Sequence, residues 1–320
     1  MALENVNRFI KPDIANSNRH WSLEDLHMLA SQRLPDLITD RNDLILRADV
    51  NSLWLRWFIE GFCSPLRYVD DKTKGEAHVL VDVTKRVDEL FSPEPAPRRQ
   101  TFAKQIAERV MEEVTRQRGL KRDFATTKIK KDLIAVSATP RCWMCGFAFP
   151  EEAIGAFLKK PGTGLLQLPK IVDILRPRGL NKRDISIEVE HITPVASGGS
   201  GVDNLALACG WCNRYKGAKS LIYDASFRAP RSPYILGGHK LNELPHPFWT
   251  IRILAVRRTC EHIGGCDARA DTHEMFIAPV NCLGSPNPSN LQVFCGEHDP
   301  HRLDRFVSSA EARKVWDERQ

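Results

Sequence analysis

Four cysteines in two pairs have a spacing that binds metal. Two residues separate Cys142 from Cys145, and two separate Cys209 from Cys212. Two CxxC pairs supply the four thiolates of a closed tetrahedral zinc site. The sequence therefore predicts a structural Zn²⁺ here, the alternative being four buried cysteines without metal. Four thiolates leave no open position for water, so this zinc would not take part in catalysis.

The segment between the two pairs carries groups that could hydrolyse an ester of phosphate. Glu190 and His191 are adjacent in this segment, and Asn213 lies just beyond it, directly after Cys212. A histidine can accept a proton from water near neutral pH. Carboxylate and amide oxygens suit Mg²⁺, which neutralises charge on a phosphate. Taken singly, His191 is more often a structural histidine and Asn213 a helix cap, so the interpretation depends on their joint occurrence.

The order of these residues resembles the HNH, or ββα-metal, endonuclease family over about residues 141–220, in its four-cysteine zinc variant. The matching positions are Glu188 to Pro194, Gly198 and Gly199, Asn204, and Cys209 to Gly217. The resemblance implies that His191 is the general base and that Asn204 braces the loop that bears it. It also implies that Glu190 and Asn213 hold a catalytic Mg²⁺ or Mn²⁺. The family often has a histidine where this chain has Asn213, and many members share the asparagine.

Several charged residues around this motif have two interpretations. Arg214, Lys216 and Lys219 lie on the helix predicted after the second cysteine pair, where contact with phosphates and simple solvation are equally expected. Glu188 could assist the metal, but a surface carboxylate is the more common case.

The last third of the chain contains a second, altered copy of the pattern. Phe276 to Val280 resembles His191 to Val195, and Asn290 to His298 resembles Asn204 to Cys212. Phe276 then takes the place of the general base and Asp299 that of Asn213, so we expect this copy to be inactive. A chance similarity is the alternative. The predicted ligands of a second structural zinc are Cys260, Cys266, Cys295 and His298, with His262, His273 and Cys282 as competitors. Cys63 and Cys282 would remain thiols.

The fold that must position these groups is predicted as α+β. We expect strands over 185–189 and 204–209 and a helix over 213–219 around the motif. Upstream, helices are predicted over 23–34, begun by Ser22 and Asp25, over 99–118 and over 126–136. The expected domains are a helical N-terminal domain (1–140), the nuclease module (141–230) and the degenerate, inactive zinc module (231–320).

The composition is that of an ordinary globular protein, and a mild basic excess concentrated around the motif weakly favours a polyanionic partner. The chain has 46 basic and 40 acidic residues, a net charge of +6, and residues 141–230 hold 12 basic against 8 acidic residues. No apolar run is long enough to span a membrane and no signal peptide is evident, so a cytoplasmic protein is expected.

The predicted function is a metal-dependent endonuclease that cuts DNA, RNA not being excluded. The resemblance implies that its products carry a 5′-phosphate and a 3′-hydroxyl. The resemblance suggests bacterial restriction or anti-phage defence as the setting, with a partner ATPase or self-association. The alternative is a non-catalytic, zinc-stabilised nucleic-acid-binding or scaffolding protein.

Overall fold

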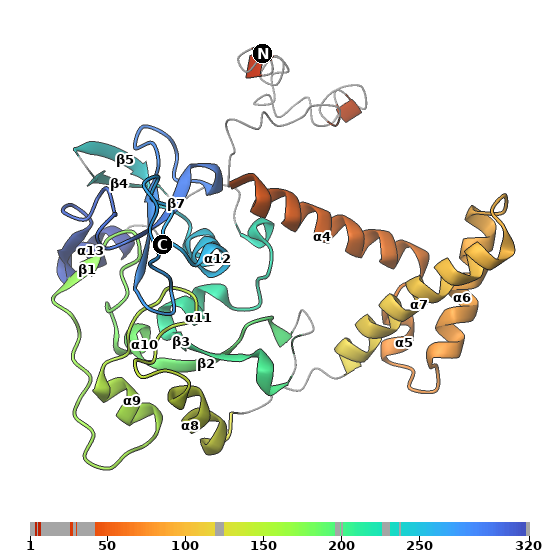
Figure 1. The fold of residues 1–320 in the computed structure, drawn as a ribbon, viewed down its shortest axis with the longest axis horizontal. Helices are drawn as coiled ribbons and strands as arrows, with labels where there is room; N and C mark the ends of the chain where they lie inside the picture. Colours follow the sequence, from red (N-terminus) through yellow and green to blue (C-terminus); the bar gives the residue numbers. More distant parts are fainter. Residues whose placement is uncertain are drawn as a thin grey trace.

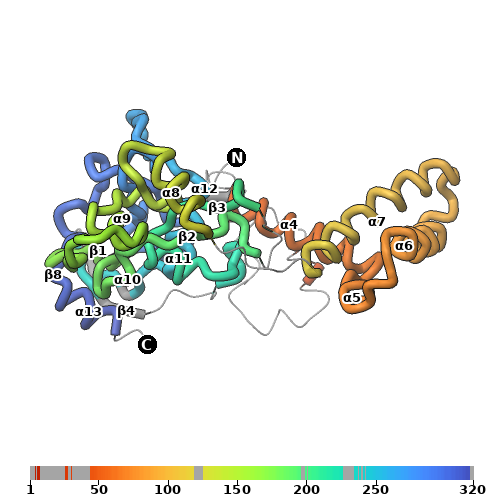
Figure 2. The backbone as a smooth tube through the Cα atoms, turned by 90° about the horizontal axis from the view of Figure 1, so that it is seen from below, coloured from red at the N-terminus to blue at the C-terminus, as the bar shows by residue number. Residues whose placement is uncertain are grey.

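The computed structural model describes residues 4, 6–7, 26–27, 30, 42–118, 125–195, 199, 201–225, 231–236 and 238–317. Its described residues form a helical lobe and a larger mixed body, and one long helix, α4, leads from the body to the lobe in both views (Figures 1 and 2). Together they are α+β, as predicted. No helix in these ranges is long and apolar enough to cross a membrane.

The lobe is built from helices that bury a stripe of valines. Its helices are α4 (Asn42–Phe62), α5 (Leu66–Val69), α6 (Glu76–Leu90) and α7 (Ala96–Arg118). Val79, Val83 and Val87 of α6 recur every four residues and pack with Val110 and Val114 of α7, all of them fully buried. The helix predicted over 99–118 is confirmed and begins three residues earlier, because prolines are accepted in a first helical turn.

Other predicted helices fall partly outside the described residues. Of the helix expected over 23–34, residues 26, 27 and 30 are described and are helical. Ser22 and Asp25, which were expected to begin it, lie outside the described residues. Helix α8 (Thr127–Ala135) confirms the third prediction, and the Thr126 side chain caps it by accepting the Ile129 amide at 3.3 Å.

The centre of the body is an antiparallel hairpin followed by a helix. Strands β2 (Ile187–His191) and β3 (Leu205–Cys209) pair with His191 opposite Leu205, and α11 (Gly210–Lys216) follows at once. The strand predicted over 185–189 was placed two residues early. Asn181 and Asp184 form a reciprocal capping box that begins a short helix, α10 (Lys182–Ile185), so residue 185 is helical. The helix predicted over 213–219, by contrast, starts three residues earlier, at Gly210, and ends at Lys216.

A second hairpin lies in the last third of the chain. Strands β6 (Met275–Pro279) and β7 (Leu291–Cys295) pair antiparallel, and α12 (Pro247–Arg257) packs against both. Turns, not a helix, occupy residues 296–304, so the expected second ββα unit keeps only its two strands. The other α-helices and strands of the described residues are α9 (Glu151–Phe157), β1 (Ile171–Asp173), β4 (Arg231–Leu236), β5 (His239–Glu243), β8 (Phe306–Ser308) and α13 (Ser309–Asp317).

The body has one continuous apolar core. This core includes residues from Cys142 to Trp316 and also Ile45 of α4, whereas the lobe has its own core. Strand β1 pairs with β8, so segments from the second and third predicted modules share a sheet. The module boundaries at 140 and 230 stay predictions.

Candidate active site and zinc clusters

The side chains of one face of β2 meet one turn of α11. Glu188 and Glu190 alternate along the strand and therefore point to the same side. The Asn213 amide donates to Glu188, which also accepts from Arg183 Nε at 2.7 Å. Lys216, three residues after Asn213, places its Nζ 2.5 Å from Glu190 Oε1. The predicted metal ligands thus lie on facing elements, but in this structure each carboxylate is already held by the protein.

His191 is the last residue of β2. Neighbouring side chains of a strand point to opposite faces, so Glu190 and His191 can serve one site only if the strand ends or bends there. The structure meets this condition, because β2 ends at His191. The His191 carbonyl accepts a hydrogen bond from Lys216 Nζ at 2.8 Å, and the side chain is half-buried. The base predicted from the sequence therefore sits where the hairpin meets the end of α11.

Asn204 holds the loop that follows His191. Its side chain accepts the Thr193 amide at 2.8 Å and donates to the Thr193 carbonyl at 2.9 Å. Gly199 packs so closely against these two residues that any added Cβ would collide with the Thr193 carbonyl and the Asn204 amide. The loop therefore requires a glycine here, and its geometry is fixed at both ends.

The three basic residues predicted to contact nucleic acid lie in different surroundings. Arg214 pairs with the buried Asp184 at 2.7 Å. Lys216 is buried, whereas both of its predicted roles, contact with phosphates and simple solvation, need an exposed side chain. The helix begins at Gly210, and its packing on the hairpin turns Lys216 inward. Lys219 lies over the ring of Phe248 at 5.6 Å. The roles of Arg214 and Lys219 in binding nucleic acid stay predictions.

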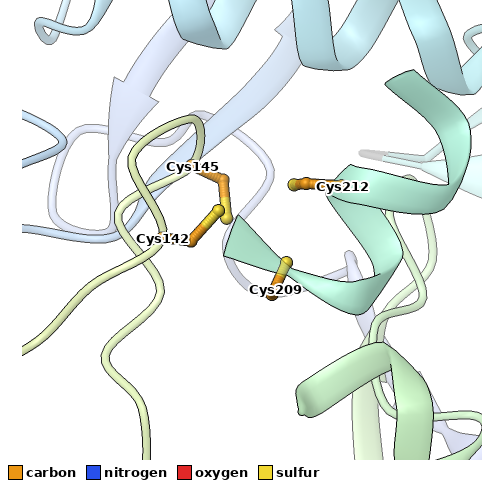
Figure 3. Close-up of side chains that lie close together, drawn as sticks. All are labelled: Cys142, Cys145, Cys209 and Cys212. Carbon is orange, nitrogen blue, oxygen red and sulfur yellow. The ribbon is translucent and has the colours of Figure 1, made fainter. Parts of the chain in front are cut away.

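The four cysteines of the two CxxC pairs converge in the body (Figure 3). Their sulfur atoms all lie within 4.8 Å of one another, and all four residues are buried. Burial opposes ionisation of Cys145, but hydrogen bonds from the other three thiols and the charge of Arg176 lower its pKa well below the ordinary value. Burial raises the pKa of Cys209 and of Cys212. A Zn²⁺ bound by all four sulfurs would supply the positive charge that favours their thiolate forms in this buried place.

Two buried arginines provide a test of whether zinc fits this cluster. Arg178 donates to Cys145 Sγ at 3.3 Å and stacks 3.7 Å above the Phe147 ring. Arg176 and Arg178 share a single carboxylate, that of Glu274. Burial alone would lower the pKa of Arg176, but the charge of Cys145 and Glu274 raises it. Two buried guanidinium groups with one carboxylate require further negative charge, which a zinc tetrathiolate would provide.

The second cluster brings together the four predicted ligands. The ligand atoms of Cys260, Cys266, Cys295 and His298 all lie within 4.8 Å of one another. The competing ligands are not among the four converging groups. His262 lies beside the cluster and stacks on His298 with ring centroids 4.1 Å apart, whereas His273 contacts Thr272 and Cys282 lies 3.4 Å from His301.

The hydrogen-bond register corrects our alignment of the second hairpin. In the first hairpin His191 lies opposite Leu205, and in the second Pro279 lies opposite Leu291. Pro279 therefore takes the place of His191, and the assignment of Phe276 to that place was wrong. The reason is loop length, because residues 280–290 form a loop two residues shorter than 192–204. Ala278 takes the place of Glu190, so two of the catalytic residue types are missing.

The two hairpins otherwise share their local hydrogen bonds. Asn290 accepts the Asn281 amide and donates to the Asn281 carbonyl, both at 2.9 Å, as Asn204 does with Thr193. The cysteine loops also match, since the amides of Trp143 and Glu261 donate to the middle of β3 and β7 at 2.9 and 2.8 Å. The shared bonds support a duplicated scaffold.

Sequence reasoning missed the arginines at the first cluster and the partner of Glu190. Arg176 and Arg178 lie more than thirty residues from either cysteine pair, so no local spacing marks them. The sequence did carry a signal for Lys216, because it follows Asn213 by three residues, and this separation places two side chains on one face of a helix.

The comparisons with known proteins agree with the motif. A family model described as HNH endonuclease matches residues 179–219, which span α10, β2, β3 and α11. No curated protein and no solved structure gave a significant match.

Proposed function

Because residues 179–219 form an HNH endonuclease domain, we propose that this protein is a metal-dependent endonuclease that hydrolyses DNA phosphodiester bonds. The observation that carries the proposal is the meeting of β2 and α11, where His191 and Glu190 end the strand and Asn213 and Lys216 face it. A zinc-stabilised scaffold needs none of these groups, and the second hairpin has the scaffold with Pro279 and Ala278 in their places.

In this proposal His191 takes a proton from the attacking water. A histidine suits this role, because an imidazole can accept a proton near neutral pH. Asn204 acts through the loop, since its two bonds to Thr193 fix the chain directly after His191. The products are a 5′-phosphate and a 3′-hydroxyl. Arg214 and Lys219 are placed to contact phosphates, while Lys216 is assigned to the interior of the site.

The catalytic cation would be held by Glu190 and Asn213, with Glu188 adjacent. These groups supply only oxygen ligands, which suits Mg²⁺ or Mn²⁺, and the ammonium of Lys216 already occupies a place among such oxygens. When bound, the cation would neutralise charge on the transition-state phosphate and the leaving oxygen.

We propose that both sulfur clusters hold Zn²⁺ for structural purposes. Each cluster offers four ligand atoms within 4.8 Å of one another, and four protein ligands would leave no position for water on the zinc. The second hairpin then stabilises the fold or widens the DNA contact without catalysing cleavage.

The test is plasmid nicking by the full chain with Mg²⁺, compared with His191→Ala. We expect the variant to lose nicking while zinc content, measured by mass spectrometry, stays the same. Equal nicking by the two proteins would reject a catalytic His191, and binding without nicking by both would support the non-catalytic alternative. Cleavage of linear DNA, nicked circles and RNA would show whether the protein cuts one strand or both and whether it accepts RNA.

A further inference from the structure

The interior of the proposed active site contains a buried cation supplied by the chain. Lys216 is only 6% exposed and Glu190 only 9%. The Lys216 Nζ lies 2.5 Å from Glu190 Oε1 and 2.8 Å from the His191 carbonyl. A carboxylate and a carbonyl are the ligands that a hard divalent cation takes. The ammonium therefore sits in surroundings that also suit the metal.

We propose that Lys216 is a positioning residue that competes with the catalytic metal for Glu190. Without metal, its ammonium neutralises the carboxylate and holds the end of β2 through the His191 carbonyl. With metal, the ammonium leaves Glu190. The inference deepens the proposed function and rests on it for the identity of the site.

The two carboxylates on this face of β2 differ in a way that assigns the competition to Glu190. Glu188 has a side chain 22% exposed and is held by Arg183 and Asn213 near the surface. Glu190 has a side chain 11% exposed, with Lys216 as its ion-pair partner. A buried carboxylate is costly without a counter-charge, so Glu190 requires a cation whether the metal is present or absent.

The structure offers space for the displaced side chain. A pocket of about 220 Å³ adjoins the site, and Lys216 forms part of its lining together with Thr193, Pro194, Lys219 and Phe248. The ammonium can therefore turn away from Glu190 by rotating its own side chain, while the backbone of α11 stays in place.

The direct test measures Mn²⁺ binding to the zinc-loaded full chain by electron paramagnetic resonance. Lys216→Met should bind Mn²⁺ about tenfold more tightly than the wild type, because the competing state is removed. Lys216→Arg keeps the charge and should stay close to the wild type. Lys182→Met, which removes an exposed lysine from the neighbouring α10, is the matched control. An unchanged Mn²⁺ affinity in Lys216→Met would overturn the proposal.

A second measurement keeps the proposal testable if Lys216→Met folds poorly. Lys216→Met leaves Glu190 without its ammonium, so its melting temperature should fall without metal and recover with Mn²⁺. The metal-induced rise should exceed that of the wild type, and equal rises would contradict the competition. In the same assay Glu190→Gln should abolish the rise and Glu188→Gln should reduce it less. The reverse order would show that Glu190 and Lys216 form a permanent ion pair.

These readouts are independent of nuclease activity. If Lys216→Met binds Mn²⁺ more tightly but no protein nicks DNA, the metal site stands and the proposed function fails. If nicking depends on His191 but Mn²⁺ affinity is the same in Lys216→Met and the wild type, the proposed function stands and the competition fails.

Discussion

Asn204 binds both backbone groups of Thr193, its Oδ1 accepting the amide at 2.8 Å and its Nδ2 donating to the carbonyl at 2.9 Å. The two bonds close the loop between β2 and β3 two residues after His191. Because a side chain amide can satisfy an amide and a carbonyl at once, an asparagine is suited to this position where alanine or aspartate is not.

We expect Asn204→Ala to reduce nicking about 10- to 100-fold, because the proposed base is no longer held in one geometry. The loss of two hydrogen bonds should cost about 1–3 kcal/mol in the free energy of unfolding. Single-turnover cleavage and urea unfolding measure the two effects.

The second hairpin provides the matched control for this prediction. Asn290→Ala removes the same pair of bonds from Asn281 and should lower stability by a similar amount, but nicking should be retained. An equal loss of nicking in both variants would show that Asn204 acts only through overall stability.

Local spacing in the sequence predicted the parts of the site that lie close together in the chain. The cysteine pairs fix their own geometry, since two residues between ligands form one tight turn, and the structure brings all four sulfurs together. Asn204 and the glycine loop are likewise local, and the bonds to Thr193 follow from a hairpin closed at that point. The α+β class followed from helical periodicity before residue 140 and short strands after it.

Features that depend on register and packing could not be predicted in this way. The matching letters Ile, Pro and Val favoured Phe276 as the counterpart of His191, but hydrogen bonds select the register, and they place Pro279 there. The burial of Lys216 depends on where α11 begins and how it packs on β2. The contact between Arg178 and Cys145 joins residues 33 apart in sequence through tertiary structure alone.

Arg178→Ala should weaken zinc binding at the first cluster. The guanidinium donates to Cys145 Sγ at 3.3 Å, and outer partners of a metal site typically change affinity about 10- to 100-fold when removed. We expect faster zinc transfer to a chromogenic chelator than in the wild type. Arg183→Ala, which removes a guanidinium with a side chain 61% exposed, is the control, and equal release rates in the two variants would contradict the prediction.

His301 should make the body less stable in mild acid. Burial, and then the charge of Arg305, lower its pKa below 6.5, against the opposing effects of the Pro279 carbonyl and Asp299. The unfolded chain therefore binds the proton more readily, so this contribution is complete above pH 6.5 and is lost as the pH falls below it. His301→Gln should flatten the dependence of unfolding free energy on pH below about pH 6.5. A slope unchanged from the wild type would argue against it, and His78→Gln controls for the loss of an imidazole from the lobe.

Asp49 is predicted to fasten the lobe to the body. Its carboxylate accepts the Ile222 amide and pairs with Arg252 Nη2, both at 2.6 Å, and its side chain is 3% exposed. Helix α4 carries it at the end that enters the body core, so the lobe's long helix is held by a buried polar contact. Asp49→Ala should cost about 1–3 kcal/mol, because it leaves a buried amide without its acceptor.

The lobe contains a matched ion pair for comparison. Asp88 and Arg99 also lie 2.6 Å apart, but the Asp88 side chain is 49% exposed, and exposed pairs contribute about 0–1 kcal/mol. Hydrogen exchange at the Ile222 amide and along α4 should therefore accelerate in Asp49→Ala and stay unchanged in Asp88→Ala. Similar acceleration in both variants would mean that burial of the Asp49 carboxylate does not hold the lobe, and that apolar contacts such as Ile45 do so instead.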